Sequence, residues 1–246
     1  MKVIFIGKKE KWLTAIVIAL LIGFIFSWQY FTHNAVPTAG DPYYHGLEQG
    51  KKISLTINVD WGEEYLPDML KVLEENNVKA TFFLTGRWAE NNPALAKKIA
   101  DNGHEIGNHA YSHTGPNSLS YEGNREEISK TAAAIKKATG VDCKLYAPPS
   151  GEKGTQVLQA AADEGYTTIL WSIDTVDWKR PAPDVIIERV LKKAHPGGII
   201  LAHPTNPTLE ALPAILQRLQ DEGYQFVTVS ENIGLKATEG NNAAAK

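Results

Sequence analysis

The amino-acid sequence predicts an α/β domain shaped as a distorted barrel of seven or eight βα units, preceded by one membrane-spanning helix. Three observations support this fold class. From residue 53 onward short apolar runs alternate with amphipathic stretches, no nucleotide-type glycine loop interrupts them, and unusual polar residues follow the ends of the apolar runs. In βα barrels the strand ends form one rim, where the chemistry gathers.

The membrane-spanning helix is predicted from a long apolar run near the N-terminus. Residues 12–31 would form about 30 Å of helix, which matches the hydrocarbon thickness of a bilayer. Lys8, Lys9 and Lys11 precede the run, and no basic residue follows it until Lys51. The positive-inside rule therefore places the N-terminus in the cytoplasm and the rest outside. A cleaved signal peptide is the alternative, but the run is long for one and no A-x-A-like site follows closely.

The rest of the chain divides by composition. The expected order is a cytoplasmic N-terminus (1–11), a single-pass anchor (12–31), a Pro- and Gly-rich linker (32–52), one barrel domain (53–234) and a small, polar, disordered tail (235–246). A formal net charge of -3 argues against nucleic acid as a partner, and oligomeric state is left open. The single cysteine, Cys143, has no disulfide partner within the chain and reads as a small buried residue.

Strands and helices are expected in alternation through the barrel domain. The predicted strands are 53–59, 80–84, 104–107, 144–147, 167–173, 198–202 and 225–229. The predicted helices are 66–77, 93–103, 124–140, 155–165, 183–194 and 208–223, several of which end at glycine.

Two histidines suggest a metal site on the rim. His109 and His113 are four residues apart, a spacing that would place both imidazoles on one side of a helical turn. Asp60, at the end of the first strand, would add an oxygen ligand. Two histidines and a carboxylate would leave positions open for water and substrate, as a hydrolytic zinc site requires. The alternative without a metal is that His109 and His113 are surface or capping histidines and that Asp60 is a turn residue.

A second group of candidates follows later strands. His203 follows the run 198–202, and a carboxylate at Asp177 or Asp174 would orient it so that it donates a proton to a leaving amine. Trp178 would offer a platform for a sugar ring. The substrate-binding candidates after the run 144–147 are Pro148 and Pro149. The structural alternatives are that His203 is a hydrogen-bonded histidine without a catalytic role, that Asp174 and Asp177 cap a helix or form a turn, and that Trp178 packs in the core.

The motifs together resemble the polysaccharide deacetylase family, carbohydrate esterase family 4. GHEIGNHAYSH is similar to its histidine motif, DTVDW to its fourth motif and LAH to its fifth, in the family's order over about residues 53–234. The resemblance implies a distorted βα barrel that holds zinc, or alternatively cobalt or manganese, on His109, His113 and Asp60. It also implies His203 with Asp177 as the acid pair, and Leu201 beside Trp178 as the pocket for the acetyl methyl.

Two positions depart from the family pattern. Where the family's first motif resembles T-F-D-D-G, this chain has Thr56 to Gly62 as TINVDWG, so Asn58 stands in place of the catalytic base. A carboxamide has no basic lone pair at neutral pH and cannot take a proton from water. The arginine that pairs with that base is replaced by Ala147. The loss of the aspartate and the loss of the arginine are physically linked, because losing the aspartate alone would leave the arginine as an unpaired cation in a confined site.

The resulting prediction is a metal-dependent N-deacetylase of a cell-wall glycan, such as peptidoglycan, with Asp60 as ligand, base or both in turn. A metal site of the two histidines alone, with Asp60 as base, is a variant of this prediction. The alternative is a catalytically silent glycan-binding or assembly protein, and a third hypothesis is a metal amidase or esterase for another acyl group. The Asn58 and Ala147 changes also resemble a sporulation-associated branch of the family.

Overall fold

The computed structural model describes residues 12, 16–24, 40–48 and 50–235. The chain forms two compact units, Met1–Val36 and Pro37–Lys246. Residues 16–24 of the first unit are helical, and much of the predicted anchor, like the tail 236–246, lies outside the described residues. Among the described residues, no helix has both the length and the apolar character needed to cross a bilayer.

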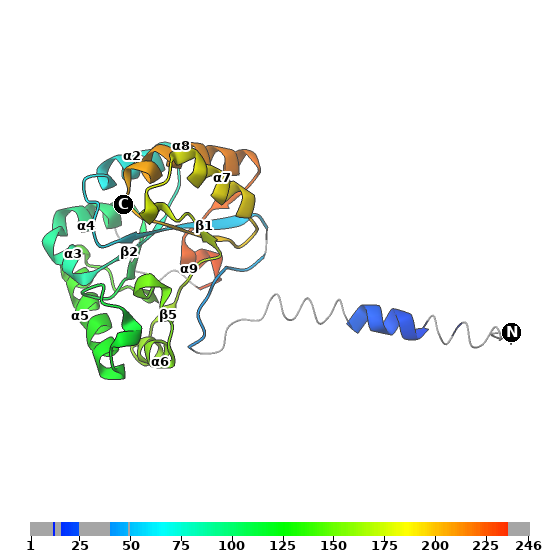
Figure 1. Ribbon diagram of the computed structural model, residues 1–246, viewed down its shortest axis with the longest axis horizontal. Helices are drawn as coiled ribbons and strands as arrows, with labels where there is room; N and C mark the ends of the chain where they lie inside the picture. Colours follow the sequence, from blue (N-terminus) through cyan, green and yellow to red (C-terminus); the bar gives the residue numbers. More distant parts are fainter. Residues whose placement is uncertain (1–11, 13–15, 25–39, 49, 236–246) are drawn as a thin grey trace, which may run out of the picture. The chain divides into compact units, whose positions relative to one another are not determined.

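The second unit is built on one parallel sheet of eight strands (Figure 1). The strands follow the order β5-β4-β3-β2-β1-β7-β6, and β8 pairs with the start of β1. Their bounds are β1 Lys52–Val59, β2 Thr81–Leu84, β3 Glu105–Asn108, β4 Leu145–Tyr146, β5 Thr167–Thr168, β6 Ile173–Asp174, β7 Ile199–Ala202 and β8 Gln225–Phe226. Because neighbouring strands are parallel, their carboxyl ends share one edge.

The sheet curls into a half-barrel and does not close among the described strands. A single strand over 167–173 was expected, and this prediction is wrong: β5 pairs with β4, whereas β6 pairs with β7 at the other end of the sheet. The run is split because its two halves belong to opposite edges of the curl. The last predicted strand, 225–229, is also too long, because Val229 already begins a helix.

Part of the expected linker lies against the domain. Tyr43 forms a bridge with Ile169, and His45 forms one with Gly198. The Leu170 N–H donates to the Tyr43 carbonyl at 2.7 Å, so residues beside the gap between β5 and β6 find backbone partners in this segment.

The predicted helices are all present. Their bounds are α2 Leu66–Glu75, α4 Pro93–Asp101, α5 Tyr121–Thr139, α6 Thr155–Asp163, α7 Pro183–Lys193 and α8 Asn206–Asp221. Two short helices were not predicted, α3 Gly86–Asn91 and α9 Val229–Asn232. Thr85 caps the N-terminus of α3 by accepting a hydrogen bond from Trp88 N–H, so the segment TGRW begins a helix.

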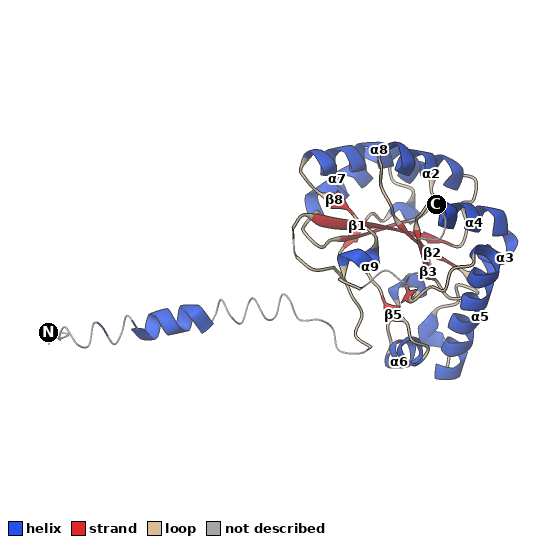
Figure 2. Cartoon of the chain, turned by 180° about the vertical axis from the view of Figure 1, so that it is seen from behind, coloured by secondary structure: helices blue, strands red, loops and turns tan. Residues whose placement is uncertain are grey.

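Both faces of β1 are covered, and its alternating residues separate two environments. Ile53, Leu55, Ile57 and Val59 pack in the main core with residues of α2, α7 and α8. Figures 1 and 2 show these helices along one side of β1 and α9 on the other side. The opposite face of β1 therefore points into the curl of the half-barrel, where its polar residues determine the site.

Candidate functional site

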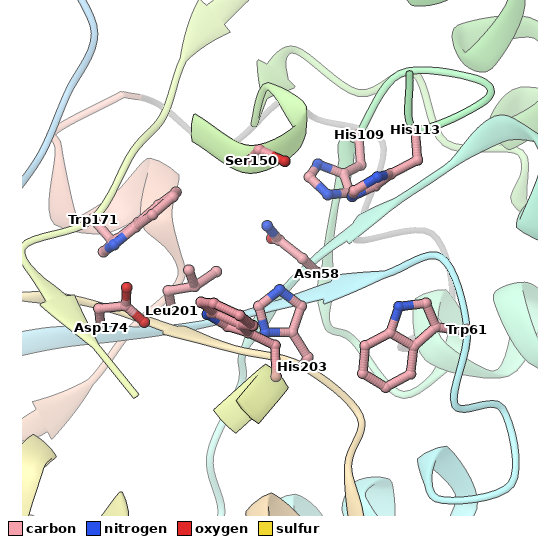
Figure 3. A pocket seen from close by; sticks show the side chains of 10 residues that line it. Asn58, Trp61, His109, His113, Ser150, Trp171, Asp174, Leu201 and His203 are labelled. Carbon is pink, nitrogen blue, oxygen red and sulfur yellow. The ribbon is translucent and has the colours of Figure 1, made fainter. Parts of the chain in front are cut away.

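A cavity of about 490 Å³ opens at the carboxyl ends of the strands. Its lining residues come from five separate segments of the chain: Asn58, Trp61, His109, His113, Ser150, Trp171, Asp174, Trp178, Leu201 and His203. Most of these were predicted from their positions after the strands. Figure 3 shows Asn58 between the His109 and His113 pair on one side and His203 on the other.

The two histidines of the predicted metal pair come together, but by a route other than the expected helical turn. His109 follows β3, and residues 109–115 form an irregular loop in which Ala110 and His113 have φ of 60° and 58°. The ring centroids of His109 and His113 are 5.0 Å apart. The Glu127 carboxylate on α5 holds the loop by accepting hydrogen bonds from the N–H groups of Tyr111 and Ser112.

His109 is buried and presents one nitrogen to the cavity. Its Nδ1 lies 2.6 Å from the Ala147 carbonyl, and because a carbonyl only accepts, Nδ1 carries the proton. Burial, with the nearby His113 and His203 imidazoles, lowers the pKa of His109 to about 3. His109 is therefore neutral near pH 7, with Nε2 as an acceptor or ligand atom. The backbone of Ala147 thus orients His109, although its side chain is not the expected arginine.

His203 is paired with Asp177, which decides between the two aspartates left open by the sequence. The His203 Nδ1 lies 2.7 Å from Asp177 Oδ1, and the His203 N–H donates to Oδ2 at 2.6 Å. Thr208 Oγ1 donates to the same Oδ2 at 2.6 Å, and Asp177 is 0% exposed. Asp174 instead lines the cavity and accepts from Val176 N–H. Asp177 therefore fixes the His203 ring through Nδ1, and Nε2 is the ring nitrogen that does not contact Asp177.

Asp60 is held away from the cavity wall. Its Oδ1 accepts from Thr85 Oγ1 at 2.9 Å, and both carboxylate oxygens lie within 3.2 Å of Arg87 Nη2. Asp60 is not among the cavity-lining residues. It follows the end of β1 and turns toward the start of α3, where a guanidinium and a hydroxyl together satisfy its charge.

The described side chains do not fit the metal site predicted from two histidines and Asp60. The donor atoms that face the cavity near His109 and His113 belong to imidazoles and to the Asn58 amide, all of which can be neutral. In the described part of the chain, no group of three His, Cys, Asp or Glu side chains is close enough to share a metal ion. Hydrolytic zinc sites bind the metal with three protein ligands and leave a further position open, and the described side chains near His109 and His113 do not supply such a set.

Tryptophans dominate the cavity wall. Trp178 is 54% exposed and Trp61 is 38% exposed, and the Trp61 ring lies nearly parallel to that of His203, at 8° with centroids 6.1 Å apart. Trp171 lies between β5 and β6. Exposed aromatic faces of this kind suit the apolar faces of sugar rings. Trp61 and Trp171 were not predicted as site residues, although each stands near the end of a predicted strand.

The segment after β4 contributes differently from expectation. Pro148 and Pro149 are buried and do not line the cavity, whereas Ser150, with φ of 56°, does. Val176, beside the Asp177 turn, also has a positive φ of 53°. Such left-handed conformations of non-glycine residues cost energy and persist where packing imposes them, often at functional sites.

The comparisons with known proteins agree with this architecture. Residues 46–169 match the family model described as polysaccharide deacetylase. The chain belongs to the polysaccharide deacetylase family. This membership confirms the resemblance inferred from the motifs. A peptidoglycan-N-acetylglucosamine deacetylase of Bacillus cereus is 37% identical over 191 residues, which cover 76% of this chain and 70% of that enzyme.

Other relatives include a pseudoenzyme. The Bacillus subtilis protein YlxY is 46% identical over 191 residues, and this chain spans only 60% of its length. The structure of BA3943 of Bacillus anthracis, a CE4 family pseudoenzyme, aligns with a TM-score of 0.78 at 44% identity and covers 80% of this chain and 70% of BA3943. A BA3943 mutant with restored enzymatic activity aligns at 42% identity with the same TM-score, over 80% of this chain and 72% of that mutant.

Proposed function

We propose that this polysaccharide deacetylase domain binds the N-acetylated glycan strands of peptidoglycan in its cavity and does not hydrolyse them. The observation that carries the proposal is the position of Asp60, whose carboxylate is bound by Arg87 and Thr85 instead of facing His109 and His113. The peptidoglycan deacetylases among the relatives support the ligand class, and the BA3943 pseudoenzyme supports the absence of turnover.

The cavity has the features of a sugar site. Trp61, Trp171 and Trp178 supply flat apolar faces, while Asn58, Ser150 and His109 supply polar groups that can orient hydroxyl and amide substituents. Asp174 is the one carboxylate among the described lining residues. This combination of a largely apolar wall and a few convergent polar groups favours an uncharged saccharide.

Two features argue against turnover by the chain as it stands. Asn58 lacks a basic lone pair, so it cannot take the proton of an attacking water. The ion pair with Arg87 also removes the Asp60 carboxylate from the histidines. A hydrolase of this architecture requires both a base and a third ligand, and the described geometry supplies neither.

The test is to purify the full chain in detergent and measure two quantities. We expect isothermal titration calorimetry to show saturable binding of an N-acetylglucosamine tetramer, weakened several-fold in Trp178→Ala. We expect no acetate release from that tetramer or from peptidoglycan after loading with Zn²⁺, Co²⁺ or Mn²⁺. Release by the wild type would overturn the silent assignment, and a wild type without tetramer binding would overturn the glycan assignment. Release that appears only in Asn58→Asp would support both parts.

A second candidate is peptidoglycan N-deacetylation, the activity predicted first from the sequence. It is favoured by the His203 and Asp177 pair, whose geometry suits a proton donor and exceeds what sugar binding requires. Turnover would require Asp60 to leave Arg87 and join His109 and His113 around a divalent ion, with Zn²⁺ the expected metal. Metal-dependent acetate release by the wild type, lost in His203→Ala, would favour this candidate.

We also propose that the domain is held outside the cytoplasmic membrane by residues 12–31 and that it acts during sporulation. The apolar run and its flanking lysines support the location, and the resemblance to a sporulation-associated branch supports the timing. Protease treatment of intact protoplasts should degrade a C-terminal epitope and spare an N-terminal one. A reporter fusion should rise on entry into sporulation; protection of the C-terminal epitope or constant expression would refute the respective part.

A further inference from the structure

Two lysine side chains lie over aromatic rings next to the cavity. The Lys179 ammonium is 4.9 Å from the centre of the Trp178 ring, and the Lys153 ammonium is 4.5 Å from the centre of the Tyr44 ring. Both rings are accessible, since Trp178 is 54% exposed and Tyr44 is 38% exposed. Trp178 lines the cavity, whereas neither lysine is among the lining residues. The Lys179 ammonium therefore stands at the edge of the cavity wall.

The pair of Lys153 and Tyr44 lies beside Trp171, another residue of the wall. A Cβ on Gly151 would lie 2.7 Å from the Trp171 ring, so this ring packs against the backbone two residues before Lys153. The residue before Trp171 donates its backbone N–H to the Tyr43 carbonyl at 2.7 Å, and Tyr43 directly precedes Tyr44. Both members of the pair thus come from segments in contact with Trp171 or its neighbour.

Neither ammonium has a carboxylate partner in the described part of the chain. The ion pairs there involve other cations. Glu152 directly precedes Lys153, but its Oε2 accepts from the Asn117 N–H at 2.7 Å. Asp177, two residues before Lys179, is 0% exposed and accepts three hydrogen bonds. Both exposed lysines therefore keep a charge that a ligand can neutralise.

The positions of the rings and the ammonium groups separate two parts of a ligand. An aromatic face contacts the apolar side of a sugar ring, whereas an ammonium without a partner attracts an anion. Inside the cavity, the Asp174 carboxylate would repel a second carboxylate. A sugar bound in the cavity would therefore keep an acidic substituent outside, where Lys153 and Lys179 lie.

We propose that Lys153 and Lys179 bind carboxylates of the glycan strand just outside the cavity, so that the domain prefers the acidic glycan of peptidoglycan to a neutral N-acetylglucosamine polymer. This inference rests on the proposed glycan binding and adds the class of glycan that this site takes. Peptidoglycan has carboxylates of two origins, the lactyl ether of each N-acetylmuramic acid unit and the stem peptide attached to it. Both present the same group to an ammonium.

The test measures dissociation constants of the full chain in an uncharged detergent with a chelator, at about 0.02 M salt. The matched probes are a tetrasaccharide of alternating N-acetylglucosamine and N-acetylmuramic acid with free lactyl carboxylates, and the same tetrasaccharide with those carboxylates converted to amides. We expect the acid to bind about tenfold more tightly, and the preference to shrink at about 0.5 M salt. A third probe carries stem peptides, which replace the lactyl carboxylates by peptide carboxylates.

The variants remove one charge at a time. Lys153→Gln and Lys179→Gln should each weaken binding of the acid about threefold, and the double variant about tenfold, with binding of the amide unchanged. Lys137→Gln is the matched control, because Lys137 is exposed in the last turn of α5, which ends before β4 and so away from the carboxyl ends of the strands. It should bind both probes like the wild type. Equal unfolding temperatures show that each variant is folded.

An N-acetylglucosamine tetramer separates this inference from the proposed function. A wild type that binds this tetramer but does not distinguish the acid from the amide overturns the role of the lysines and leaves glycan binding standing. A double variant that keeps the preference for the acid does the same. A wild type that binds none of the probes overturns the proposed function as well. Tighter binding of the acid than of the peptide probe assigns the lysines to lactyl carboxylates, and the reverse order assigns them to the stem peptide.

Discussion

Asp177 anchors the His203 end of the cavity, and replacing it with asparagine tests that arrangement. The carboxylate is 0% exposed and accepts three hydrogen bonds, two from His203 and one from Thr208. Asp177→Asn keeps the size of the side chain but removes its charge and converts one acceptor oxygen into an NH₂ donor. The perturbation is therefore electrostatic, with little change in packing.

The magnitude follows from the three contacts. Hydrogen bonds to a charged group contribute about 1.5–3 kcal/mol each. The least costly orientation keeps the amide oxygen at the Oδ2 position and places NH₂ against His203 Nδ1, which sacrifices one charged contact and makes the other two neutral. We expect the free energy of unfolding to fall by about 3 kcal/mol. For a domain of this size that lowers Tm by roughly 6–12 °C.

The assay is urea unfolding of the full chain in detergent, followed by tryptophan fluorescence. Asp174→Asn is the matched control, because the Asp174 side chain lines the cavity and accepts a single backbone hydrogen bond from Val176. We expect it to lower stability by less than about 1 kcal/mol. If Asp177→Asn is no more destabilising than Asp174→Asn, the network around His203 does not hold this end of the cavity in place.

Three further predictions concern other parts of the domain. Burial, followed by the charge of Lys79, lowers the pKa of His104 from 6.5 to about 4. The unfolded chain then binds a proton that the folded chain does not, so stability should fall by roughly 3 kcal/mol as the pH drops from 6.5 to 4, and His104→Gln should show a shallower fall in urea titrations. Gly62 has φ of +83° and a Cβ there would lie 2.2 Å from the Pro204 carbonyl oxygen, whereas Gly140, with φ of +80°, has open space. Gly62→Ala should therefore lower Tm clearly more than Gly140→Ala, and equal shifts would refute the close contact. Arg87→Ala should release Asp60 and raise the Zn²⁺ retained after dialysis, measured by mass spectrometry, with less than about 1 kcal/mol lost because the Arg87 side chain is 52% exposed. Unchanged zinc content would show that Arg87 is not what keeps Asp60 from the histidines.

Local patterns in the sequence were sufficient for most of the strands, for the longer helices and for the edge of the sheet at which the site lies. Alternating apolar runs identify parallel strands covered by helices, and parallel strands place their carboxyl ends together. Asn58 stands near the end of such a run, and His109 and His203 follow one, so their meeting in one cavity was predictable. The family motifs added the expected roles of these residues.

Only the tertiary structure decided which partner each side chain takes. Asp177 and not Asp174 binds His203, Ala147 supplies its carbonyl to His109, and Asp60 pairs with Arg87, across 26, 38 and 27 residues respectively. The curl of the sheet likewise divided 167–173 between two edges and brought Trp171 into the wall. A residue's own neighbours in the chain determine which face of a strand it occupies, whereas its partner depends on how distant segments are brought together in space.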